Sequence, residues 1–152
     1  MYADNPNLKG RVSEAEEKVI GTKVFDVMPE VFFDEKPITG EFACIYGRKN
    51  EGRIIKWSKR EYYSNHPDFD KWKVFLTKSS GSGTLGEILS KPVLGEPGSG
   101  ATQTFISFGN FGSKKEAQNC LKYIQSKFCR IMLGTLNVTQ HNPKNTWRNV
   151  PL

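Results

Sequence analysis

The segment from Ser113 to Gly134 restricts the possible folds of this chain more than any other. It opens with Ser113-Lys114-Lys115-Glu116, a capping box in which a serine hydroxyl and a glutamate satisfy the free N–H groups of a helix start. Apolar residues then recur at the helical period: Ala117, Cys120, Leu121, Ile124, Phe128, Ile131 and Met132. Polar residues fall roughly on the opposite face: Lys115, Lys122, Ser126 and Arg130. We therefore predict one long C-terminal helix that buries one face and ends near Gly134.

Short segments rich in β-branched and aromatic residues precede this helix. The clearest pair is 42–46 and 53–57, which a polar, glycine-flanked segment joins as a β-hairpin. Further strands are predicted over 23–27, 31–33, 72–77, 92–94 and 102–108. A second capping box, Ser13 to Glu16, predicts a short N-terminal helix that runs toward Ile20. The fold class expected is α+β, with a small, mostly antiparallel sheet packed against one long C-terminal helix.

The charge of the chain is unevenly distributed. The 152 residues, the length of one ordinary domain, carry a net charge of +6. Residues 1–41 hold 9 acids and 5 bases, whereas residues 42–152 hold 7 acids and 17 bases. We interpret 1–41 as an acidic lead-in and 42–152 as a basic recognition domain, which together form one compact domain. A locally basic domain of this kind favours a polyanionic partner, most often nucleic acid.

Several classes of protein do not fit the sequence. No apolar run approaches the ~18 residues of a membrane helix, and the start of the chain lacks the apolar core of a secretory signal. Three cysteines favour a reducing, cytoplasmic setting over a disulfide framework. No C-x-x-C motif is present, and His66 and His141 lie far apart in the sequence, so no metal ligands are predicted.

Basic and amide side chains gather in three places that suit DNA. Arginine and lysine neutralise phosphates, and arginine, asparagine and glutamine also pair with base edges. The first group lies in and after the hairpin: Arg48, Lys49, Asn50, Arg53, Lys56, Lys59 and Arg60. The second follows the strand 72–77, in a Gly/Ser-rich loop: Lys78, Ser80 and Ser82. The third is near the end of the chain: Gln140, His141, Asn142, Lys144 and Arg148.

Four blocks in the second half of the chain resemble a known family. They are Asp70 to Leu76, Lys91 to Ser99 followed by Thr102 to Phe105, Ser113 to Ala117 followed by Tyr123 to Arg130, and Thr139-Gln140 with Val150-Pro151-Leu152. In this order they resemble the C-terminal region of adenine-specific DNA methyltransferases of type II restriction–modification systems, including forms fused to a restriction nuclease. The resemblance is good from about Asp70 onward and loose over the first 60 residues.

The resemblance implies a prokaryotic, cytoplasmic target-recognition domain whose partners are duplex DNA and a methyltransferase core of the same full-length polypeptide. S-adenosylmethionine would bind in that core. The family's N-P-P-Y motif, which holds a flipped adenine, has no counterpart here, because Asn5-Pro6-Asn7 lacks the second proline and the aromatic residue. We therefore assign no catalytic residue and no cofactor to this chain, and expect it to be part of a larger protein.

Two other classes of function stay open at this point. One is a free-standing hydrolase or nuclease that uses Ser99 or the region of Asp68. The other is a protein-interaction domain whose basic surface meets an acidic partner or the rest of its own polypeptide.

Overall fold

The structure, a computed structural model, describes residues 1–11, 20–49, 52–63, 66–78, 90–136, 144–148 and 150. The chain divides into two compact units. Unit 1 consists of Met1–Asp70 and Pro97–Thr104, and unit 2 consists of Lys71–Glu96 and Phe105–Leu152. The division follows contacts within the chain rather than the change of charge after Glu41. The α+β class is confirmed, but the strands form two three-stranded sheets, so the prediction of a single sheet is wrong.

Unit 1 is built on the predicted hairpin. β1 (Phe42–Lys49) pairs antiparallel with β2 (Gly52–Lys59), and β1 also pairs parallel with β5 (Ser99–Ala101), which gives the order β2-β1-β5. The strands are longer than predicted, because Arg48 and Lys49 continue β1 instead of forming the connection. The sequence did not predict β5, since Ser-Gly-Ala carries none of the residues typical of strands.

One face of the hairpin carries the core of unit 1. Ala43 and Ile45 of β1 are fully buried and pack with residues of the N-terminal segment, among them Leu8, Val24 and Phe25. Gly47 continues this face. A Cβ at that position would lie 2.1 Å from Phe25 Cε2, so only glycine allows the phenyl ring to rest against the strand.

The segment before the hairpin contains helical turns in place of the two predicted strands. α2 (Val24–Val27) is followed by a 3-10 turn (Pro29–Val31), and Phe33 forms only an isolated antiparallel bridge with Trp57. Pro29 explains part of this difference, because proline has no N–H for a sheet ladder and favours the first turn of a helix. Two further 3-10 helices are Pro6–Leu8 and Arg60–Tyr63. The predicted helix from Ser13 toward Ile20 falls almost entirely on residues outside those described.

Unit 2 contains an antiparallel sheet. β3 (Trp72–Thr77) lies between β4 (Val93–Gly95) and β6 (Phe105–Phe111), in the order β4-β3-β6. The strand predicted over 72–77 is confirmed at both ends. The strand predicted over 102–108 begins three residues later and continues to Phe111.

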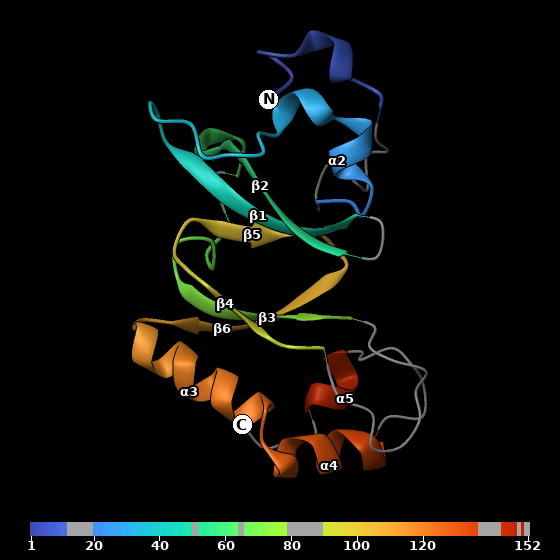
Figure 1. Ribbon diagram of the computed structural model, residues 1–152, viewed down its shortest axis with the longest axis vertical. Coiled ribbons are helices and arrows are strands. Elements are labelled where there is room, and N and C mark those ends of the chain that lie inside the picture. Colours follow the sequence, from blue (N-terminus) through green and yellow to red (C-terminus); the bar gives the residue numbers. More distant parts are fainter. Residues whose placement is uncertain are drawn as a thin grey trace. The chain divides into compact units, whose positions relative to one another are not determined.

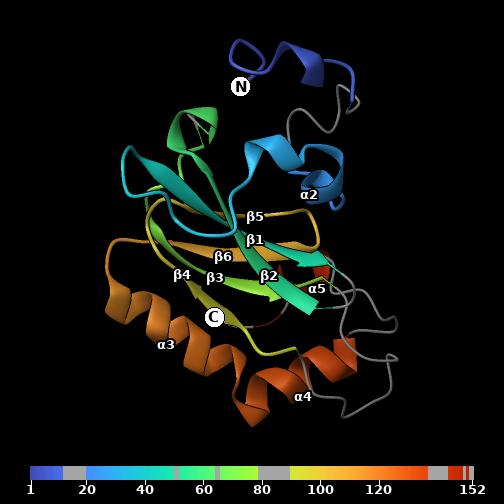
Figure 2. The same ribbon diagram turned by 45° about the horizontal axis from the view of Figure 1, so that its top comes forward.

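The predicted long C-terminal helix is wrong in one respect, because the chain forms two helices there. α3 (Lys114–Ile124) ends before Ser126, and α4 (Lys127–Leu136) begins after it. The Ser126 hydroxyl accepts a hydrogen bond from the Cys129 N–H at 3.1 Å, which caps the start of α4. Figures 1 and 2 show the chain bending between the two helices. The capping box at the start of α3 is confirmed, as the Ser113 side chain accepts from the Glu116 N–H and the Glu116 side chain from the Ser113 N–H.

The core of unit 2 lies between its sheet and its helices. Val74 and Leu76 of β3 pack in one cluster with Ile124 of α3 and Leu133 of α4. Trp147 of α5 (Lys144–Arg148) joins this cluster, with its ring 4.5 Å from that of Phe108. Figure 1 shows α3 and α4 along one face of β4-β3-β6.

The bend after α3 changes the expected placement of two cysteines. A continuous helix would put Cys120 and Cys129 on opposite faces, but in the structure Cys129 lies in the core cluster of unit 2 and Cys120 packs against it. Burial raises the pKa of Cys129 to about 11, so its thiol stays protonated and unreactive at neutral pH. Among the described residues, no helix has the length and apolar character needed to cross a bilayer.

Candidate nucleic-acid interface

Two arginines lie side by side near the end of the hairpin. Arg48 of β1 and Arg53 of β2 are direct cross-strand partners, so their side chains leave the same face of the sheet. This face is opposite to the core-facing side of the hairpin, on which Ala43 and Ile45 are buried. Burial and the neighbouring charge of Arg48 both lower the pKa of Arg53. An anion between the two guanidinium groups would relieve their repulsion, and guanidinium binds phosphate through paired hydrogen bonds.

The lysines of the hairpin have acidic partners instead. Lys49 Nζ lies 3.1 Å from Asp26 Oδ1, and Lys56 Nζ pairs with Asp34. Lys59 Nζ lies 2.8 Å from Asp4 Oδ2 and 3.4 Å from Glu61 Oε1. Three of these four acids belong to the acidic lead-in, residues 1–41. The lead-in therefore neutralises lysines that the sequence assigns to DNA phosphates.

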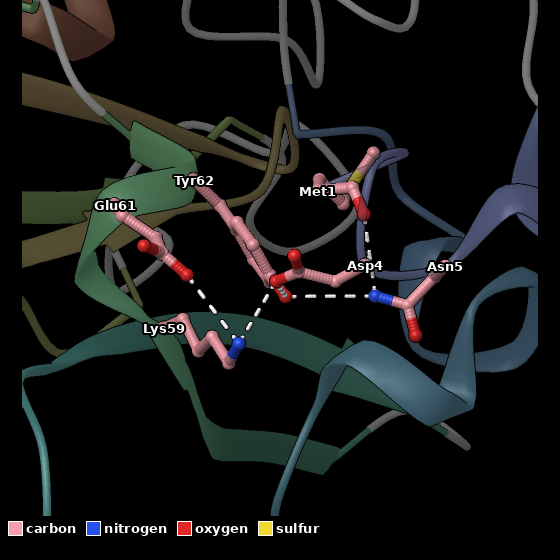
Figure 3. A network of polar contacts seen from close by, with 6 residues as sticks. All are labelled: Met1, Asp4, Asn5, Lys59, Glu61 and Tyr62. Carbon is pink, nitrogen blue, oxygen red and sulfur yellow. Dashed lines mark hydrogen bonds and ion pairs between the residues drawn. The ribbon is translucent and has the colours of Figure 1, made fainter.

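Figure 3 shows the most connected of these contacts. Asp4 Oδ2 accepts hydrogen bonds from Lys59 Nζ and from Tyr62 Oη, each at 2.8 Å. Asn5 Nδ2 donates to Tyr62 Oη at 3.5 Å and to the Met1 carbonyl oxygen at 3.3 Å. The hydrogen bond between Lys59 and Asp4 lowers the pKa of Asp4 and raises the pKa of Lys59. This network holds the first residues of the chain on the end of β2.

Arg60 also has a structural role. Its Nη2 lies 2.6 Å from Asp70 Oδ2, and its Nη1 donates to the Tyr63 carbonyl oxygen at 3.2 Å. The guanidinium carbon lies 4.3 Å from the centre of the Phe69 ring. An arginine held by a carboxylate, a carbonyl and a ring face has little freedom left to reach a phosphate.

The remaining predicted residues belong to unit 2 or lie outside the described part of the chain. Lys78 is exposed directly after β3, and Lys144 and Arg148 are the first and last residues of α5. Six predicted positions fall outside the described residues: Asn50, Ser80, Ser82, Gln140, His141 and Asn142. Of the predicted set, the structure brings together Arg48 and Arg53 of the hairpin.

The two units differ sharply in charge. Unit 1 contains 11 bases and 13 acids, a net charge of −2, whereas unit 2 contains 11 bases and 3 acids, a net charge of +8. The positive charge of the chain therefore belongs to unit 2, although the sequence directed attention to the hairpin. The opposite charges of residues 1–41 and of the hairpin were a signal in the sequence that the two segments pair.

The alternative enzymatic functions would use Ser99 or the region of Asp68. Ser99 lies in β5 and is 3% exposed, a position with little access for a substrate. Asp68 is half-buried, and its N–H donates to His66 Nδ1 at 3.4 Å. Within the described ranges, no three His, Cys, Asp or Glu side chains come close enough to hold a metal ion.

Comparison with protein-family models, curated proteins and solved structures finds no match for this chain.

Proposed function

We propose that this chain is a DNA-recognition module of a restriction–modification adenine methyltransferase. In this proposal it binds duplex DNA and delivers a short target site to a methyltransferase core on another part of the full-length polypeptide. The core binds S-adenosylmethionine and carries out methyl transfer. The family assignment depends on the sequence blocks between Asp70 and the end of the chain, and the DNA-binding role also has structural support.

The observation that carries the DNA-binding role is the cross-strand pair of Arg48 and Arg53. Like charges placed directly opposite each other on a sheet are destabilising, and an anion bound by both guanidinium groups would offset that cost. A two-stranded β-ribbon also fits the major groove of B-DNA, where arginine pairs with the O6 and N7 atoms of guanine. Through the same contacts, the pair would hold either a phosphate or a guanine edge.

Fluorescence anisotropy with a labelled 20-base-pair duplex of mixed sequence tests the proposal. We expect wild-type protein to bind at low salt, with an affinity that falls linearly on a log–log plot as salt is raised. The double variant Arg48→Ala/Arg53→Ala should bind about 30-fold more weakly at 0.15 M salt, since each lost phosphate contact costs about fivefold there.

The matched control is Lys9→Ala/Lys23→Ala, which removes the same charge from exposed positions of unit 1 outside the hairpin. We expect its affinity to stay close to that of the wild type. The proposal is wrong if wild-type protein fails to bind duplex DNA at low salt, or if the two double variants lose affinity equally. Incubating the same wild-type protein with plasmid DNA and Mg²⁺ tests the nuclease alternative, for which nicked plasmid is the positive result.

A further inference from the structure

The exposed face of α3 carries four polar side chains that the proposed function does not use. The helix buries Ala117 and Ile124 against the core of unit 2. On the opposite face lie Lys115, Gln118, Asn119 and Lys122, all exposed. These positions are three, four and seven residues apart, so the two amides lie between the two lysines on one side of the helix.

None of these four side chains has a partner within the described part of the chain. A glutamate one turn away from a surface lysine would compensate its charge and stabilise the helix. Residues 114–136 hold five bases and a single acid, Glu116. That acid is already engaged, because its Oε2 accepts a hydrogen bond from the Ser113 N–H at 3.0 Å. The face therefore combines positive charge that has no acidic partner among the described residues with amide groups that are exposed and available to a ligand.

Unit 2 presents this face on a firmly held helix. The capping box fixes the start of α3, and the helix packs against β3, β4 and β6. Lys114 Nζ lies 5.4 Å from the centre of the Trp72 ring, a further contact between the first turn and β3. A surface on a rigid element can position base-reading side chains more precisely than a loop can.

The size and chemistry of the face match duplex DNA. An 11-residue helix is about 16 Å long, and a helix of that kind enters the major groove, which is about 12 Å wide. Lys115 and Lys122 are two turns apart, about 10 Å along the axis, and can reach separate phosphates. Glutamine and asparagine are the side chains that pair with the N6 and N7 atoms of adenine.

We infer that α3 is a second DNA-contact surface, in which Lys115 and Lys122 bind phosphates and Gln118 and Asn119 read base edges in the major groove. The inference rests on the proposed function, since it concerns the same ligand. It assigns the sequence readout to unit 2, the unit with a net charge of +8.

Two double variants of the full chain test this inference. Lys115→Ala/Lys122→Ala should weaken binding to the mixed-sequence duplex about 30-fold at 0.15 M salt, uniformly across sequences. Gln118→Ala/Asn119→Ala should change which sequences are enriched from a random duplex pool, relaxing the preference at one or two base pairs. All four substitutions introduce alanine, the residue most favourable in helices, so α3 should persist, and circular dichroism checks this.

The control is again Lys9→Ala/Lys23→Ala, which makes the same change of charge on unit 1. If the wild type binds duplex and both α3 variants match the control, while Arg48→Ala/Arg53→Ala binds weakly, the inference is overturned and the proposed function stands. If the wild type does not bind duplex at all, both fail. Binding that requires α3 but prefers single strands or an acidic polypeptide to duplex DNA also overturns the inference.

Discussion

The hairpin of unit 1 and helix α3 of unit 2 are both rich in lysine, yet their lysines stand in opposite situations. Lys49, Lys56 and Lys59 of the hairpin each pair with a carboxylate of the same unit. Lys115 and Lys122 of α3 are exposed and have no acidic partner among the described residues. The number of basic residues in a segment therefore says little about the positive charge that the segment offers to a ligand.

The difference has a physical origin in how the chain distributes its acids. The described residues of the segment 1–41 pack on the hairpin, and three of their carboxylates pair with its lysines. Exposed ion pairs of this kind add little to stability, because solvent and salt screen them. Their larger consequence is electrostatic, because they neutralise lysines that would otherwise attract phosphates.

The largest expected effect comes from disrupting the packing of α2 against the hairpin. Gly47→Ala places a Cβ against the Phe25 ring and should lower the free energy of unfolding by about 1–3 kcal/mol, the usual cost of overpacking. Gly52→Ala in the same hairpin is the control, because its nearest neighbour is the Lys49 carbonyl oxygen at 3.4 Å, an ordinary contact. Urea unfolding measures both, and equal losses would contradict the close packing described for Gly47.

A second change removes the acidic partners of two lysines of the hairpin. Asp26→Asn/Asp34→Asn removes the carboxylates that pair with Lys49 and Lys56, so these lysines become available for phosphates. Duplex affinity should rise by up to about fivefold for each lysine at 0.15 M salt. Glu35→Gln/Glu41→Gln removes the same charge from exposed positions of the same segment. If this control raises the affinity equally, net charge explains the effect and the pairing does not.

The smallest expected effect concerns pH. Because the hydrogen bond from Lys59 lowers the pKa of Asp4, the ionised carboxylate stabilises the folded state. That contribution is complete above the ordinary pKa of an aspartate, about 4, and is lost as the pH falls through the lowered pKa. Lys59 has a raised pKa, so its contribution is present below the ordinary lysine pKa and is lost only at strongly alkaline pH.

An NMR titration of the Asp4 carboxyl group measures this effect directly, and Lys59→Met should return the pKa of Asp4 toward its ordinary value. A carboxyl group that titrates at its ordinary pKa in the wild type would contradict the network of Figure 3.

Features that depend on neighbouring residues could be predicted from the sequence. The capping box at Ser113, the hairpin and the strand Trp72–Thr77 are all confirmed. The break after α3 could not be predicted, since the apolar period continues through it and only the hydroxyl of Ser126 caps the next helix. The acidic partners of Lys56 and Lys59 lie 22 and 55 residues away, and such pairs are set by the tertiary fold.

The most direct test of the central claim, that α3 supplies phosphate contacts that the paired lysines of the hairpin do not, is the salt dependence of duplex binding. The quantity to measure is the slope of the logarithm of the duplex association constant K against the logarithm of the salt concentration. It is measured for the wild type and for two double variants, Lys115→Ala/Lys122→Ala in α3 and Lys56→Ala/Lys59→Ala in the hairpin. We predict that the α3 variant reduces the slope by about two, or about one for each lost phosphate contact, and that the hairpin variant leaves it nearly unchanged. Equal reductions in the two variants, or a reduction confined to the hairpin variant, would contradict the account.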